Sequence, residues 1–95
     1  MPIPPVLIQR NPEICAAELD GEICLFHPDT AQYLNLNATG SAIWRLLETP
    51  THRDDLVARL LARFVVEEAL CRQETEAFLR EALALGMLHE DPAPA

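Results

Sequence analysis

Residues 33–44, YLNLNATGSAIW, change from a strand pattern to a helix pattern within a few positions. In the first part, Leu34 and Leu36 share one face of an extended segment, and Tyr33 and Asn35 share the other. This stretch therefore predicts a strand that leads directly into a helix, and the rest of the fold is predicted by working outward from that junction.

The second part of the stretch begins an amphipathic helix, in which apolar residues recur with a period of about 3.6 residues. Ile43, Trp44 and Leu47 form its inner face. Asn37 or Thr39 is available as the N-terminal cap, because either side chain can accept a hydrogen bond from a backbone N–H of the first turn. A single tryptophan one turn into such a helix is most often a core anchor, so we expect Trp44 to join helix to sheet rather than to stack on a ligand.

Two segments upstream of this stretch predict a β-hairpin. Residues 14–19 and 22–27 flank Asp20-Gly21, a dipeptide that tolerates the positive φ angles of a two-residue turn. This turn places Leu19 opposite Glu22 and sets the pairing of the whole ladder.

A second turn at Pro28-Asp29 returns the chain in a third strand, residues 32–36. The simplest arrangement is an antiparallel meander with the second strand in the centre. The first and third strands are then edges, each with unpaired backbone donors and acceptors.

Two further helices follow the first. The second starts at Thr51, where Asp54 three residues later gives a capping-box-like pattern, and the third runs over residues 67–85 with Gly86 as its stop. The sum is an α+β domain, a three-stranded antiparallel sheet followed by three helices.

Prolines near both ends set the predicted limits of this domain. Residues 1–12 contain four prolines and are predicted as an extended arm, and residues 91–95 as a frayed tail. The single domain then covers residues 13–90.

The composition favours one globular domain and disfavours nucleic acid as a partner. The chain has 95 residues, enough for one core, and its formal net charge of -8 repels phosphate backbones. Its 3 cysteines form neither a CxxC pair nor an even disulfide framework, and no apolar run approaches membrane-spanning length. We therefore expect a cytoplasmic protein with no nucleic acid partner and no membrane contact.

No group of side chains has the spacing of a catalytic or metal site. His27, His52 and His89 stand in no paired ligand motif with one another or with the cysteines. The carboxylates of the third predicted helix have the spacing of a solvated face: Glu67, Glu68, Glu74 and Glu76. We expect no metal, no cofactor and no catalysis by this chain.

The free edge of the third strand suggests a binding role instead. An extended peptide can add to a free sheet edge through main-chain hydrogen bonds, and neighbouring pockets then supply specificity. We expect residues 32–36 to form one wall of a groove, with the third helix as the other wall.

Several motifs occur in a fixed order along the chain. They are ELDGE at 18–22, PDT at 28–30, YLNLNATG at 33–40, IWRLL at 43–47, FL at 78–79 and GML at 86–88. In this order the chain resembles the PqqD family, the RiPP recognition elements, which are peptide chaperones for ribosomally made, post-translationally modified peptides. The resemblance covers about residues 10–90.

This resemblance implies a winged-helix-like fold that binds the leader of a precursor peptide between the third strand and the third helix. The chaperone then presents the precursor to a modifying enzyme, such as a radical SAM maturase or a lasso-type leader peptidase. The strand wall so implied is Tyr33, Leu34, Asn35 and Leu36. Our choice for the helix wall is Cys71, Thr75, Phe78 and Leu79, with Arg72 able to meet an acidic leader. Phe78 fits the core and the groove equally well.

Two other hypotheses remain open from the sequence. A winged-helix DNA-binding regulator would need a recognition helix with a basic outer face, but acidic residues outnumber Arg72 and Arg80 on the third helix. A structural subunit would pair its sheet edge with a second copy, as a homodimer.

Overall fold

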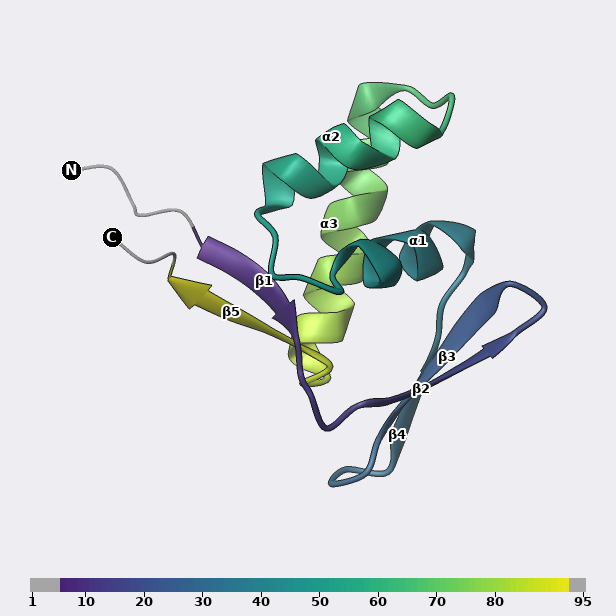
Figure 1. Ribbon diagram of the computed structural model, residues 1–95, viewed down its shortest axis with the longest axis vertical. Helices are drawn as coiled ribbons and strands as arrows, with labels where there is room; N and C mark the ends of the chain where they lie inside the picture. The colour runs from purple at the N-terminus through teal and green to yellow at the C-terminus, as the bar shows by residue number, and fades with distance from the viewer. Residues whose placement is uncertain (1–5, 93–95) are drawn as a thin grey trace.

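The computed structural model describes residues 6–92 and folds them into two antiparallel sheets and three α-helices (Figure 1). The elements in chain order are β1 (Val6–Arg10), β2 (Cys15–Leu19), β3 (Glu22–His27), β4 (Gln32–Asn35), α1 (Ala38–Leu46), α2 (Arg53–Arg63), α3 (Glu68–Ala84) and β5 (Leu88–Pro92). The predicted α+β class, with a three-stranded antiparallel sheet and three helices, is confirmed.

The three-stranded sheet has the order β2-β3-β4, which is the predicted meander. The hairpin between β2 and β3 turns at Asp20 and Gly21, whose φ angles of 54° and 85° match a turn that needs positive φ at both central residues. Leu19 pairs with Glu22 and Cys15 with Phe26, so the predicted register is confirmed.

The two faces of this sheet have different environments. Ile23 and Leu25 of β3 point into the core and are buried. On the outer face, the rings of Phe26 and Tyr33 lie 4.7 Å apart between centroids, and Tyr33 is 67% exposed. One face of β4 therefore continues the core, and the other is open to solvent.

The helix α1 is fixed at both its start and its centre. Asn37 is the N-cap, and its Oδ1 accepts a hydrogen bond from Gly40 N at 2.8 Å. Trp44 is only 4% exposed, as predicted for a core anchor. The Arg10 guanidinium lies 4.5 Å from the centre of the Trp44 ring, and burial lowers the pKa of Arg10 while the charge of Glu48 opposes this.

The start of α2 differs from its prediction. The helix begins at Arg53 with His52 as N-cap, and the His52 side chain makes no capping hydrogen bond. Thr51 instead exchanges backbone hydrogen bonds with Ile8 of β1, at 2.9 and 3.0 Å, and its hydroxyl donates to Thr49 O. The predicted capping box at Thr51 is wrong, because pairing with β1 keeps that residue outside the helix.

A two-stranded sheet of β1 and β5 was not predicted from the sequence. Ile8 pairs with Glu90 across this sheet and is fully buried. The fold therefore includes residues 6–12 and 91–92, which the sequence pattern assigns to the arm and the tail. The prolines of the first segment stand at positions 2, 4, 5 and 12, so they flank β1 rather than interrupt it. Residues 1–5 and 93–95 of the predicted arm and tail lie outside the described residues.

The two sheets share one hydrophobic core with the helices. In Figure 1 the β1–β5 pair and the three-stranded sheet lie apart, on two sides of the helices. The largest fully buried apolar side chains come from both sheets and all three helices: Ile8, Leu25, Ile43, Leu47, Leu56, Leu60, Leu79, Met87 and Leu88. This core fixes the position of β4 relative to α3. No helix within residues 6–92 has the length and apolar character needed to cross a lipid bilayer.

Candidate functional site

The outer edge of β4 is free within the described part of the chain, because β4 pairs with β3 alone. Leu36 N donates to Ile23 O at 2.8 Å, so Leu36 directs its amide toward β3. Successive residues of an antiparallel ladder direct their N–H and C=O groups alternately to one neighbour and to the other. The backbone groups of Tyr33 and Asn35 therefore face the free edge, where they can receive another strand.

The junction between β4 and α1 is held by buried hydrogen bonds. Ser41 Oγ accepts from Ile23 N at 3.0 Å and donates to Leu36 O at 3.4 Å, which ties the helix to both β3 and the end of β4. Since Ser41 is fully buried, these bonds fix the direction in which the chain leaves β4 and enters α1.

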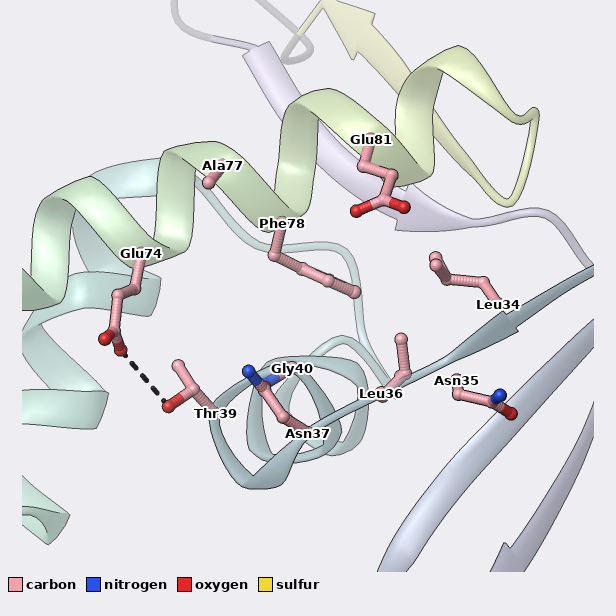
Figure 2. Close-up of a pocket in the computed structure, with 10 residues that line it drawn as sticks. All are labelled: Leu34, Asn35, Leu36, Asn37, Thr39, Gly40, Glu74, Ala77, Phe78 and Glu81. Carbon is pink, nitrogen blue, oxygen red and sulfur yellow. Dashed lines mark hydrogen bonds between the residues drawn. The ribbon is translucent and has the colours of Figure 1, made fainter.

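A cavity of about 280 Å³ lies between β4, the start of α1 and α3. Figure 2 shows Phe78 of α3 pointing toward Leu36 and Glu74 pointing toward Thr39 at the start of α1. The residues that line this cavity are Leu34, Asn35, Leu36, Asn37, Thr39, Gly40, Glu74, Ala77, Phe78 and Glu81. We call this cavity, together with the free edge of β4, the groove.

The helix wall of the groove is one stripe of α3. Glu74, Ala77, Phe78 and Glu81 follow the spacing i, i+3, i+4 and i+7, which places them on one face of a helix. Glu74 lies at one end of the groove, where it accepts a hydrogen bond from the Thr39 hydroxyl at 3.3 Å. Figure 2 shows Phe78 pointing between the walls, with Glu74 and Glu81 on either side of it along α3.

The absence of a side chain at Gly40 lets Phe78 lie against the start of α1. A Cβ atom at Gly40 would be 3.3 Å from Phe78 Cδ1 and 3.4 Å from Leu36 Cβ. Both distances are short for carbon–carbon contacts, which are most favourable at about 3.5–4.0 Å. Gly40 therefore sets how closely the two walls approach each other.

The structure brings four of the nine predicted site residues into the groove, namely Leu34, Asn35, Leu36 and Phe78. The ring of Tyr33 lies on the outer face of the sheet, where it packs on Phe26. The backbone groups of Tyr33 point to the free edge of β4. Phe78 is half-buried, packs against the core and lines the groove, so both readings of this residue apply.

The other four predicted residues lie elsewhere on α3. Thr75 and Leu79 are fully buried, and the Thr75 hydroxyl donates to Cys71 O at 2.7 Å. The structure therefore places both residues in the core and not on the groove wall where the sequence predicted them. Cys71 lines a second cavity of about 120 Å³, which shares Thr39 and Glu74 with the groove and has Phe64 and Val66 of the α2–α3 connection among its walls.

Arg72 points away from the groove. Its Nη1 donates to Asp54 at the start of α2 at 3.0 Å, and its Nη2 lies 3.8 Å from Glu68. The hydrogen bond to Asp54 is the main cause of a raised pKa at Arg72. This guanidinium joins α3 to α2 and does not line the groove.

Several groove residues were missed by sequence reasoning. The sequence pattern places Glu74 on a solvated face and shows Glu81 only as an acidic residue of the third helix. The spacing from Phe78 could have predicted both glutamates as groove residues, because Glu74 lies four residues before Phe78 and Glu81 three residues after it, on the same face of the helix. On the other wall, Asn37 and Thr39 were predicted only as candidate caps of the first helix, and Gly40 appeared only within the YLNLNATG motif.

The described residues show no other constellation suited to chemistry. Within residues 6–92, no three His, Cys, Asp or Glu side chains gather so that they could hold a metal ion. All three cysteines are free thiols, with Cys71 buried and Cys15 exposed. The groove thus offers hydrogen-bonding backbone, apolar side chains and two carboxylates, which suit the binding of an extended chain.

Comparisons with known proteins gave two similar solved structures and one matching family model. Two solved structures are similar: "TbiB1 in Complex with the TbiA(beta) Leader Peptide" has 28% identity and a TM-score of 0.76, covering 85% of this chain and 94% of that one. "Lasso peptide synthetase B1 complexed with the leader peptide" has 25% identity and a TM-score of 0.71, covering 86% and 96%. A comparison with curated proteins gave no match. The family model of PqqD, described as "Coenzyme PQQ synthesis protein D", matches residues 22–88, so the chain belongs to the PqqD family.

Proposed function

We propose that this protein binds the leader of a ribosomally synthesised precursor peptide by β-strand addition and presents the precursor to a modifying enzyme. The observation that carries this proposal is the free edge of β4 beside a cavity whose other wall is α3. Both similar solved structures are complexes with leader peptides, which supports the same class of ligand here.

In this proposal the backbone of the leader pairs with Tyr33 and Asn35. Leader side chains on the same face as Leu34 and Leu36 then point toward α3, because side chains alternate between the faces of a sheet. Phe78 supplies an apolar contact in the middle of the groove. Main-chain bonds give affinity for many sequences, and the α3 wall gives the preference among them.

The role we propose is non-catalytic, and it requires a partner enzyme. A radical SAM maturase or a leader peptidase of the lasso type fits this role, and similarity to a lasso peptide synthetase B1 supports the second of these. A cytoplasmic location stays a prediction. Pairing of the β4 edge with a second copy also stays a prediction, and such a homodimer would compete with the peptide for the same backbone groups.

The comparisons give no support to the alternative of a DNA-binding regulator. On α3, Arg72 is already paired with Asp54 and Glu68. The net charge of -8 opposes binding to a phosphate backbone. Tight binding of duplex DNA that weakens steeply with salt, in a gel-shift assay, would revive this alternative.

A peptide selected from a random display library against the immobilised chain provides a test of the groove. We expect Phe78→Ala to weaken binding of this selected peptide by about tenfold or more, because it removes the central apolar contact. Leu70→Ala is the matched control, since Leu70 is an exposed apolar residue of α3 that does not line the groove. Thermal unfolding measures whether both variants fold. Equal loss of affinity in the two variants would contradict the site.

A further inference from the structure

Two carboxylates face the groove from α3, and we propose that they select a leader with basic side chains on the α3 side. This inference rests on the proposed function and deepens it, because the free edge of β4 places a peptide in the groove and the carboxylates set the charge of that peptide. The two residues are Glu74 and Glu81, which line the cavity on either side of Phe78 (Figure 2).

The other carboxylates along α3 include two that already have cationic partners. Glu76 lies 2.7 Å from Arg53 Nη1, and Glu68 lies 3.8 Å from Arg72 Nη2. Within residues 6–92, neither Glu74 nor Glu81 takes part in a salt bridge.

In the part of the chain that the structure describes, the one side-chain hydrogen bond to these two groups comes from a neutral donor. The Thr39 hydroxyl donates to Glu74 at 3.3 Å, which leaves the negative charge of that carboxylate uncompensated. Arg72, the residue expected from the sequence to meet an acidic leader, is turned toward α2. The charge that a peptide meets on the α3 wall is therefore negative.

A peptide in the groove removes water from both carboxylates. Burying a charged group without a partner is unfavourable, and an acidic side chain placed beside one would add repulsion. A lysine or arginine of the leader instead forms a salt bridge at the site where water is lost. Complementary charge of this kind favours one class of peptide over another more than it raises overall affinity.

The spacing of the carboxylates suggests the sequence of the peptide. Glu74 and Glu81 are seven positions apart, or about 10.5 Å along a helix at about 1.5 Å per residue. In a strand, side chains on one face recur every two residues, at about 6.7 Å. Two basic residues four positions apart span about 13 Å, and their long side chains absorb the difference. An apolar residue midway between them meets Phe78. The peptide then carries a basic, an apolar and a basic residue in that order along the face that points toward α3.

The test uses peptides selected from a random display library against the full chain. We expect Lys and Arg to be enriched at two positions four residues apart in the selected peptides, with an apolar residue midway between them. For one such peptide, Glu74→Gln/Glu81→Gln should weaken binding by about tenfold, as expected for two partly exposed ion pairs.

The matched control is Glu67→Gln/Glu68→Gln, which makes the same change in net charge at the start of the same helix, away from the groove. It should change affinity by less than about twofold, because long-range charge effects are screened by salt. The reversed pair Glu74→Lys/Glu81→Lys should prefer a peptide in which the basic residues are replaced by Glu.

The outcomes separate this inference from the proposed function. Selected peptides that protect the β4 edge but lack basic residues, or that respond equally to both glutamine variants, would overturn the inference and leave strand addition intact. Selected peptides that bind without protecting the β4 edge would overturn the proposed function, and the charge preference with it.

Discussion

Gly40 is the residue at which a single methyl group would disturb the groove most directly. We expect Gly40→Ala to lower the affinity of the selected peptide by about tenfold, because the new Cβ, 3.3 Å from Phe78 Cδ1, forces the ring to move. The free energy of unfolding should change by less than about 1 kcal/mol, since the helix propensity gained by alanine offsets the crowding. Titration calorimetry and urea unfolding measure the two effects.

A second substitution provides the control for this prediction. Gly40→Ala/Phe78→Leu combines the added methyl group with a smaller side chain, so it should bind better than expected from the sum of the two single changes. Strictly additive losses would show that the contact between these residues does not shape the groove.

At the scale of single residues, the sequence predicted the strand wall better than the helix wall. Leu34 and Leu36 follow from the alternation of a strand, which has one buried face and one exposed face. On α3 the apolar stripe could be recognised, but its depth could not. Thr75 and Leu79 directly follow Glu74 and Phe78 in the sequence, yet both are fully buried. The packing of α3 against α1 and α2 decides which of these neighbouring side chains remain at the surface.

At the scale of elements, α1 depends on its N-cap. Asn37 accepts a hydrogen bond from Gly40 N at 2.8 Å, and removing this acceptor by Asn37→Ala should lower the free energy of unfolding by about 1 kcal/mol. Asn37→Asp keeps the acceptor oxygen and adds a favourable negative charge at the helix start, so it should keep most of the stability. Urea unfolding tests both variants, and an equal loss in both would mean that the cap bond contributes nothing.

The strand β1 is the element that the sequence assigned to the wrong part of the molecule. Ile8→Ala should lower the free energy of unfolding by about 2–5 kcal/mol, because Ile8 is fully buried. Gln9→Ala on the same strand should cost less than about 1 kcal/mol, since its side chain is only partly buried. Small and equal losses in both variants would support a loose arm instead of a strand.

At the scale of the whole molecule, the sequence predicted those features that depend on residues close together in the chain. The hairpin register followed from Asp20-Gly21, and the order of the meander followed from short turns. The β1–β5 sheet joins segments about eighty residues apart in the chain, as in the pairing of Ile8 with Glu90. No local sequence pattern predicts a pairing between segments this far apart. The groove likewise depends on how α3 lies over β4, which only the shared core determines.

The most direct measurement of the central claim is amide hydrogen exchange along β4 with and without the selected peptide. Tyr33 and Asn35 direct their N–H groups to the free edge, whereas Leu36 N is already bonded to Ile23 O. If a leader adds as a strand, exchange at Tyr33 and Asn35 should slow by about tenfold or more at saturation, with a smaller change at Leu36. Saturable binding that leaves the exchange rates of Tyr33 and Asn35 unchanged would contradict strand addition at this edge.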